Sequence, residues 1–347
     1  MKMLFYLGHP AHFHLFKNLI NLLIKNNNQV LITIKSKDVL EKLVQKSGYP
    51  YLNIYERTRK KNTFSILWAL FQKDIRLYSI AKKFKPDVLL GTSIEITHVG
   101  KLIGKPAYIF NEDDAAYIKE FVLLGYPFAR KIFIPKGVDA GKWDNKCLRY
   151  NGVQKLAYLH PNYFSPNKKI VSDFIMSNKP YALIRLSGLT AYHDKGIGGF
   201  TSKILKEVID VLEPNLNVFI SSESTLPIEF AKYKLEIEAE DIHHFLSFAH
   251  IFIGDSQSMS IEAAILGTYT IRFSGFAGRI TVMKIFESIG LIQSISSDSP
   301  DELLKILTEI EDIEELKRKA IELRNRYLNQ VTDVTQFFYK NLLNEKY

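Results

Sequence analysis

Short runs of β-branched and aliphatic residues alternate along this chain with longer segments whose apolar residues recur at helical spacing. Strict alternation of this kind is typical of βαβ units, whose strands lie parallel in a sheet that helices cover on both faces. The strands predicted in the first half are Met3–Leu7, Gln29–Ile34, Tyr51–Ile54, Asp87–Leu90, Ala107–Phe110 and Lys131–Ile134, and the helices include Leu15–Lys25, Asp38–Lys46 and Phe64–Phe84.

The same alternation begins again after a polar, proline-containing stretch from Pro161 to Pro180. A chain of 347 residues exceeds the roughly 250–300 residues at which one hydrophobic core stops growing. We therefore predict two doubly wound, Rossmann-like α/β domains, residues 1–165 and 166–332, which face each other across a cleft. A last helix within residues 333–347 would cross back to the first domain. The predicted second-half elements are strands Tyr181–Leu186, Asn217–Ser221, Ile251–Gly254 and Tyr269–Phe273, and helices Phe200–Leu212, Asp241–Phe248 and Ser258–Leu266.

Composition limits the compartment in which such a chain would work. The sequence is 46% hydrophobic and 24% charged, and no run approaches the roughly 18 consecutive apolar residues of a membrane-spanning helix. The first predicted strand begins almost at Met1, which leaves no room for a secretion signal. The single cysteine, Cys147, excludes an internal disulfide and a multi-cysteine metal site. These features predict a cytoplasmic protein.

The net charge of +9 is compatible with nucleic acid, an anionic membrane surface or phosphorylated substrates as partners. No zinc-finger spacing, RNA-recognition signature or helix-turn-helix stands out, so we expect no nucleic acid partner. Basic residues cluster with aromatic ones between Arg57 and Lys85, around Trp68 and Phe71. Two interpretations stay open for this segment, namely peripheral contact with the inner face of a membrane and an ordinary solvated helix face.

The segment from Ile251 to Thr268 carries the strongest local signal for a binding site. Its buried strand ends at Gly254, and small polar residues then open a helix. Free N–H groups and the dipole at a helix start favour an anion, so this turn is typical of a phosphate cradle. Glu262, about one turn inside the helix, could reach the hydroxyls of an attached ribose. The competing interpretation is a capped helix with Ser256 or Ser258 as N-cap and Glu262 exposed.

This segment, with its strand, glycine, serines, Glu262-Ala263 and Gly267, resembles the GT-B superfamily, which includes the non-hydrolysing UDP-N-acetylglucosamine 2-epimerases and the glycosyltransferase that makes lipid II. The whole chain is similar to a family of prokaryotic proteins catalogued as a domain of unknown function within that superfamily. The motifs that carry the similarity are Gly8–Phe16, Leu156–Pro161, Arg185–Ser187 with Ala191–Asp194, Ser221–Glu223 and Gly254–Gly267.

The resemblance implies a nucleotide-sugar site in the second domain and no cofactor or metal ion. Arg185 and Lys195 would neutralise the diphosphate in place of a metal, although Arg185 could instead pair with an acid in the hinge. One departure is Asp255, because many relatives have Gly-Gly where this chain has Asp255-Ser256, and an acidic side chain there would crowd a phosphate. The implied nucleotide-sugar-binding residues are Arg185, Ser187, Ser222, Glu223, Ile242, Asp255, Ser256, Gln257, Ser258 and Glu262, and Ile242 would contact the base.

A second cluster, His9, His12 and His14, lies in the predicted loop after the first strand. The resemblance places this loop on the acceptor side, and His12 or His14 is the candidate base, since imidazole titrates near neutral pH. Asp113, in the run Asn111–Asp114, could orient that ring. Two other interpretations stay open. One histidine could cap the helix while another packs, or the three imidazoles could bind a metal.

Taken together, these residues predict a metal-independent glycosyltransferase that moves a sugar from a nucleotide-sugar donor, UDP-linked in the leading hypothesis, to an acceptor. The acceptor stays open, a lipid-linked one included, and cell-surface polysaccharide or glycoconjugate synthesis is the expected setting. The first alternative is a nucleotide-sugar 2-epimerase. The second is a protein that binds a nucleotide sugar without catalysis.

Overall fold

The computed structural model describes residues 1–35, 39–55, 63–175, 177, 179–187, 199–222, 224–275 and 280–344, with the backbone alone at 55 and 63–69. The chain forms two compact units. Unit 1 comprises Met1–Tyr163 and Thr332–Tyr347, and unit 2 comprises Phe164–Val331.

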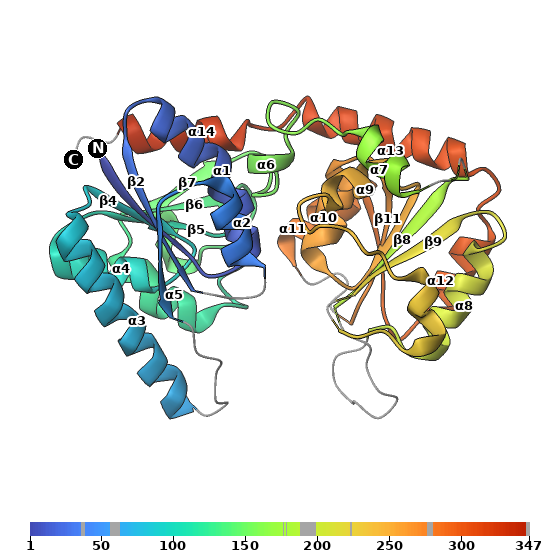
Figure 1. Ribbon diagram of the computed structural model, residues 1–347, viewed down its shortest axis with the longest axis horizontal. Coiled ribbons are helices and arrows are strands. Elements are labelled where there is room, and N and C mark those ends of the chain that lie inside the picture. Colours follow the sequence, from blue (N-terminus) through green and yellow to red (C-terminus); the bar gives the residue numbers. More distant parts are fainter. Residues whose placement is uncertain are drawn as a thin grey trace. The chain divides into compact units, whose positions relative to one another are not determined.

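In the described part of unit 1, seven parallel strands form one sheet in the order β3-β2-β1-β4-β5-β6-β7 (Figure 1). The order reverses between β1 and β4, because the chain first winds outward to β3 and then returns to pair β4 with β1. The strands are β1 (Lys2–Leu7), β2 (Gln29–Lys35), β3 (Tyr51–Tyr55), β4 (Val88–Gly91), β5 (Ala107–Phe110), β6 (Lys131–Pro135) and β7 (Cys147–Tyr150).

Helices surround this sheet, and one of them comes from the other end of the sequence. Helix α14 lies beside α1 in Figure 1 and inserts Phe338 against the rings of Phe110, Phe133 and Tyr150. Just before α14, the Asp333 carboxylate accepts hydrogen bonds from Asn162 Nδ2 at 2.8 Å and Tyr163 Oη at 2.9 Å. The helices of unit 1 are α1 (Pro10–Lys25), α2 (Leu40–Ser47), α3 (Thr63–Phe84), α4 (Glu95–Ile103), α5 (Lys119–Gly125), α6 (Leu156–Leu159) and α14 (Val334–Asn344), with 3-10 turns η1 (Tyr126–Phe128) and η2 (Gly141–Lys146).

Unit 2 repeats the design with five parallel strands among its described residues, in the order β12-β11-β10-β8-β9. Here the order reverses between β8 and β10. The strands are β8 (Tyr181–Leu186), β9 (Asn217–Ser222), β10 (Ile251–Gly254), β11 (Tyr269–Phe273) and β12 (Ile292–Ile295), and the helices are α7 (Lys168–Phe174), α8 (Ser202–Leu212), α9 (Ile242–Phe248), α10 (Gln257–Ile265), α11 (Thr281–Ser288), α12 (Pro300–Thr308) and α13 (Ile313–Leu328), with the 3-10 turn η3 (Ile228–Tyr233).

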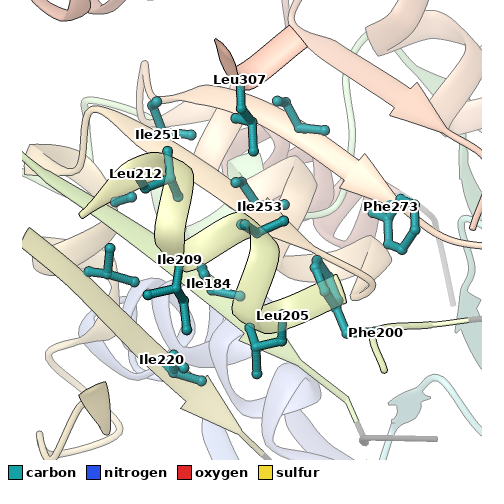
Figure 2. Close-up of a cluster of buried hydrophobic side chains, with 14 of the residues drawn as sticks. Ile184, Phe200, Leu205, Ile209, Leu212, Ile220, Ile251, Ile253, Phe273 and Leu307 are labelled. Atoms are coloured by element: carbon teal, nitrogen blue, oxygen red, sulfur yellow. The ribbon is translucent and has the colours of Figure 1, made fainter. Parts of the chain in front are cut away.

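One face of the unit 2 sheet carries an apolar core (Figure 2). Ile184, Ile220 and Ile253 project from three strands onto Leu205 and Ile209 of α8. Because successive side chains of a strand point to opposite faces, the residues next to these isoleucines project from the other face of the sheet. That second face, toward α9 and α10, therefore receives polar side chains at the strand ends.

The predicted two-domain α/β fold with parallel sheets is confirmed, and two details differ from the sequence prediction. Pro10 starts α1 with His9 as its N-cap, so the prediction that His12 and His14 lie in a loop is wrong, and both belong to the first turns of the helix. The sequence also does not predict β7 and β12. Both are four-residue edge strands without a continuous buried apolar run. In β7 three of the four positions are only half-buried and one is Arg149, and β12 contains Gln293 and Ser294. Among the described residues, no helix combines the length and apolarity that crossing a bilayer requires.

Candidate functional site

The strand order of each sheet reverses at one place, and open α/β sheets bind ligands at the carboxyl ends of the strands flanking such a switch point. In unit 2 the flanking strands are β8 and β10, and in unit 1 they are β1 and β4. Most of the polar residues singled out in the sequence follow these strands. The two switch points are therefore the candidate sites.

At the unit 2 switch point, two arginines flank a glycine in one row across three strands. Arg185 pairs in register with Gly254, which pairs with Arg272. Residues in one row of a parallel sheet project from the same face, so both arginines lie on the face toward α9 and α10, roughly 10 Å apart at their Cα atoms. This arrangement concentrates positive charge beside the start of α10.

Gly254 allows the strands to approach at this row. A Cβ atom on residue 254 would lie 2.9 Å from Phe252 Cζ and 3.0 Å from both Cβ and the carbonyl oxygen of Arg185. These contacts are shorter than van der Waals distance and two of them involve backbone or stem atoms. A side chain at this position would therefore push β8 away from β10 or displace Phe252.

The turn after Gly254 opens α10 with backbone donors. Ser256 is the N-cap, as one sequence interpretation predicts, and its Oγ accepts the N–H of Met259 at 3.4 Å. A helix leaves its first N–H groups without intrahelical acceptors, and this cap satisfies one of them. The N–H groups of Gln257 and Ser258 open the helix and, with the dipole, favour an anion there.

Asp255 connects the ends of the two strands that flank the switch point. Its Oδ1 accepts the N–H of Ser187 at 2.8 Å, which turns the carboxylate toward the end of β8. Burial raises the pKa of Asp255, and the hydrogen bond from Ser187 opposes this shift. The hydrogen bond gives the acidic side chain a structural role beside the proposed phosphate position.

The two arginines have different surroundings. Arg185 Nη1 donates to Ser221 Oγ at 2.7 Å, so a hydroxyl of β9 holds the guanidinium in place. Arg272 is 2% exposed, and its Nη2 lies 3.5 Å from Ser274 Oγ. Burial lowers the pKa of Arg272, while the nearby Glu287 and Asp255 carboxylates raise it. Arg272 is absent from the sequence prediction, although an arginine inside the apolar run Tyr269–Phe273 is a signal that could have found it.

Glu262 is buried rather than exposed as the capped-helix interpretation expects. Its Oε2 lies 3.5 Å from Nε2 of His243, and the two residues are 8% and 4% exposed. The imidazole comes from α9, so the pair joins α9 to α10. His244, by contrast, stacks on Phe164 at 4.9 Å and accepts the N–H of Asn167.

The other predicted residues of unit 2 occupy the same edge of the sheet or fall outside the description. Ile242 is the first residue of α9, and Ser222 ends β9 with its Oγ accepting the N–H of Ser224 at 3.1 Å. Glu223 and Lys195 lie outside the described residues.

At the unit 1 switch point, His12 joins the ends of β1 and β4. Its Nδ1 accepts the N–H of Gly8 at 3.1 Å, and the Thr92 hydroxyl lies 2.8 Å from Nδ1 and 2.9 Å from Nε2. Because Nδ1 accepts a hydrogen bond, the proton of the neutral ring resides on Nε2. His12 in this position can donate a hydrogen bond from Nε2.

The neighbouring histidines have local roles. His9 caps α1 by accepting the N–H of Ala11 at 3.2 Å, and His14 packs its ring against Tyr158 at 5.4 Å. This is the pattern expected if one histidine caps the helix and another packs. Among the described residues, no cluster of three or more histidine, cysteine or acidic side chains is arranged to hold a metal ion.

The loop after β5 holds three consecutive carboxylates with unequal surroundings. Glu112 forms a buried ion pair with Lys155, and Asp114 Oδ1 accepts the N–H of Asp139 at 2.9 Å. Asp113 is partly buried, and its pKa is raised chiefly by burial and then by the charge of Glu112, while Lys155 acts in the opposite direction. These surroundings favour the protonated form of Asp113 more than water does.

Several solved structures share this fold. The UDP-GlcNAc 2-epimerase from Neisseria meningitidis, solved with UDP-GlcNAc, is 14% identical, with a TM-score of 0.70 over 99% of this chain and 100% of its own. Anabaena Alr3699/HepE in complex with UDP is 13% identical, with a TM-score of 0.64 over 99% and 100%. The spinosyn forosaminyltransferase SpnP is 13% identical, with a TM-score of 0.63 over 99% of each chain.

At these identities the similarity shows the fold alone, and it is the two-domain GT-B fold that the motifs predict. None of the curated proteins matches the chain in sequence. One family does match, over residues 1–336, and its description is "Protein of unknown function (DUF354)". The chain is thus a member of the DUF354 family with a GT-B fold.

Proposed function

We propose that this protein is a glycosyltransferase that transfers a sugar from a UDP-linked donor bound by unit 2 to an acceptor hydroxyl bound by unit 1. The observation that carries the proposal is the row Arg185–Gly254–Arg272 beside the start of α10. Two guanidinium groups and free backbone N–H groups suit a diphosphate better than any uncharged ligand. Two structures of the same fold are described as bound to UDP-GlcNAc and UDP, which supports the nucleotide.

In this proposal the nucleotide lies along the carboxyl end of the unit 2 sheet. The diphosphate accepts hydrogen bonds from the start of α10 at Ser256, Gln257 and Ser258, and Arg185 and Arg272 supply positive charge in the place where other enzymes use a metal ion. Glu262, held by His243, accepts hydrogen bonds from the ribose hydroxyls. Ser187, Ser222, Glu223, Ile242 and Asp255 complete the proposed binding residues.

The reaction would begin when the acceptor hydroxyl loses its proton to Asp113 and attacks the anomeric carbon of the sugar. The bond from that carbon to the phosphate oxygen breaks, and UDP leaves with its new charge stabilised by the two arginines. We assign Asp113 as the base, in place of the orienting role that the sequence suggests, because Lys155 and the Asp139 N–H engage the neighbouring Glu112 and Asp114 carboxylates. We assign His12 as a hydrogen-bond donor from Nε2, because its Nδ1 accepts the Gly8 N–H. His14 is the weaker candidate, since its ring packs on Tyr158.

An acceptor for cell-surface polysaccharide or glycoconjugate synthesis, lipid-linked or free, would place this reaction in the cytoplasm at the inner face of the membrane. A nucleotide-sugar 2-epimerase is the second candidate. It is favoured by the run Glu112–Asp114, which could supply a second acid or base to one bound molecule.

A ligand screen followed by a product assay tests the proposal. Ligands that bind only the folded state raise the unfolding midpoint, so a thermal-shift screen across nucleotides and nucleotide sugars should select UDP and a UDP-sugar. The selected donor is then incubated with and without candidate acceptors. Acceptor-dependent release of UDP supports the transferase, and a new sugar isomer formed without acceptor supports the epimerase. Tight binding of the donor without UDP release and without a new sugar isomer would support a protein that binds the nucleotide sugar but does not catalyse a reaction.

A further inference from the structure

One segment of unit 1 holds nearly the whole net charge of the protein. From Arg57 to Lys85 the sequence has nine basic residues and one acidic residue, Asp74. This net +8 compares with +9 for all 347 residues. Most of the segment is helix α3, which packs against α4 (Figure 1).

The one acidic residue of this segment, Asp74, contacts α4. Asp74 Oδ2 lies 2.9 Å from Nδ1 of His98 on α4, and Lys73 pairs with Glu95 at the start of α4. Both interactions are part of the α3–α4 interface, and the pKa of His98 is raised chiefly by its hydrogen bond with Asp74. Lys82 and Lys83 are exposed, and Arg76, also exposed, donates from Nη1 to the carbonyl oxygen of Ile54 at 2.8 Å.

The solvent-facing side of α3 combines apolar and basic residues. Phe71 and Ile75, one turn apart, are 54% and 51% exposed, whereas Leu77 and Ala81 on the opposite side are buried. Arg76, Lys82 and Lys83 are exposed and fall on the same half of the helix at 100° per residue. We call the five exposed residues Phe71, Ile75, Arg76, Lys82 and Lys83 the α3 surface.

We propose that the α3 surface docks on a lipid bilayer that contains anionic headgroups. A polyanion in solution would engage the basic side chains but would gain nothing from Phe71 and Ile75. A bilayer offers both phosphate charges and an acyl layer, so it can contact both the basic and the apolar side chains of the α3 surface. This inference rests on the charge and exposure of α3 alone and does not depend on the sugar-nucleotide reaction.

The experiment measures binding of the full-length protein to sedimenting phosphatidylcholine vesicles with and without phosphatidylglycerol. We expect binding only when phosphatidylglycerol is present. Binding should weaken with salt, because the Debye length falls from about 10 Å at 0.1 M to about 3 Å at 1 M. Absence of binding to anionic vesicles at low salt would overturn the proposal.

Paired variants locate the contact. A lysine near an anionic surface strengthens binding roughly fivefold, so Lys82→Glu with Lys83→Glu should weaken it by about thirtyfold or more. The matched control is Lys168→Glu with Lys169→Glu, an exposed pair at the start of α7 that lowers the net charge equally. Phe71→Ser with Ile75→Ser should weaken binding by about tenfold, and Ile228→Ser, at a residue 94% exposed in unit 2, should have no effect.

Equal losses in the two lysine pairs would mean that total charge, not α3, drives the binding, and would overturn the proposal. So would unchanged vesicle binding of the Phe71/Ile75 variant together with tight, salt-sensitive binding of heparin, because that result identifies a soluble polyanion as the partner. Circular dichroism and the unfolding midpoint of each variant confirm that the fold is intact.

Discussion

The two switch points have the same strand arrangement but carry different side chains. In unit 2 one hydrogen bond, from Ser187 N–H to Asp255, joins the ends of the two flanking strands. In unit 1 the ring of His12 bridges them, because it accepts the Gly8 N–H and lies 2.8 Å from the Thr92 hydroxyl. The first lies beside Arg185, Arg272 and the backbone donors of α10, and the second is built around an imidazole. From this difference we expect anion binding at the unit 2 edge and proton transfer at the unit 1 edge, although both edges come from the same kind of sheet.

The largest expected effect is on catalysis at the unit 1 edge. Asp113→Asn should lower kcat about 10²- to 10⁴-fold, the usual range for loss of a general base, and should leave the Kd for UDP unchanged. Steady-state kinetics and calorimetric titration measure the two quantities. Asp144→Asn, at an exposed aspartate of the same unit, is the control. Weaker UDP binding by Asp113→Asn would contradict the proposal that unit 2 alone binds the nucleotide while unit 1 transfers the proton.

The same variant also has a stability signature. Because the pKa of Asp113 is raised by folding, the folded protein holds this proton more tightly, and stability falls as the pH rises from the unfolded pKa through the raised one. Asparagine has no ionisable carboxyl group, so the variant does not lose this part of its unfolding free energy as the pH rises. Asp113→Asn should therefore be more stable than the wild type above that window and equally stable below it, as urea unfolding at several pH values would show.

The next effect concerns anion binding at the unit 2 edge. Arg185→Gln removes a charged donor and should raise the Kd for UDP by roughly 10- to 100-fold, since a hydrogen bond to a charged group contributes about 1.5–3 kcal/mol. The exposed Arg318 on α13 offers a matched control, and Arg318→Gln should leave the Kd unchanged. An unchanged Kd in Arg185→Gln would show that the arginine row does not bind the diphosphate.

Alanine substitutions at the two switch-point glycines, Gly254 and Gly8, should change the free energy of unfolding by different amounts. Gly254→Ala forces a Cβ to within 3.0 Å of β8, and overpacking of this kind costs about 1–3 kcal/mol of unfolding free energy. Gly8 has only His12 Cε1 and Ser93 Oγ at 4.0 Å from the position of a Cβ, so Gly8→Ala should stay within about 0.5 kcal/mol of the wild type. Urea unfolding measures both. Similar losses of unfolding free energy in the two variants would mean that the close approach of β8 and β10 at Gly254 does not limit the side chain there.

The smallest expected effect tests the buried pair of Glu262 and His243. Glu262→Gln should weaken binding of UDP by about three- to tenfold, the contribution of one net hydrogen bond, and should weaken binding of 3′-deoxy-UDP less. The comparison of the two nucleotides distinguishes a contact with the ribose from a general loss of structure. Equal weakening of both would assign Glu262 a structural role only.

The sequence predicts the central strands well, and four of them, Ala107–Phe110, Tyr181–Leu186, Ile251–Gly254 and Tyr269–Phe273, have the predicted bounds. These strands are buried on both faces, so their apolar runs are continuous. The edge strands β7 and β12 carry no such run. The start of α1 is missed because the apolar period begins several residues after the cap, and Pro10 and His9 act through local backbone geometry.

The candidate site can likewise be predicted only in part from the sequence. A glycine turn followed by serines is visible in the sequence, because these residues are neighbours along the chain. The Arg185–Gly254–Arg272 row and the His243–Glu262 pair join residues that are tens of positions apart, so only strand register and helix packing bring them together. The unequal surroundings of Glu112, Asp113 and Asp114 depend likewise on Lys155 and Asp139 from distant loops.

Helix α14 makes unit 1 a unit built from two separate stretches of the chain. Phe338 fills the core of unit 1 against Phe110 and Phe133, and the bonds from Asn162 and Tyr163 to Asp333 fix the entry of the helix. Unit 2, from Phe164 to Val331, lies between the two stretches as one contiguous segment. The aromatic core of unit 1 therefore depends on closing a loop as long as the whole of unit 2, and the entropy of that loop closure is a cost that the contiguous unit 2 does not bear.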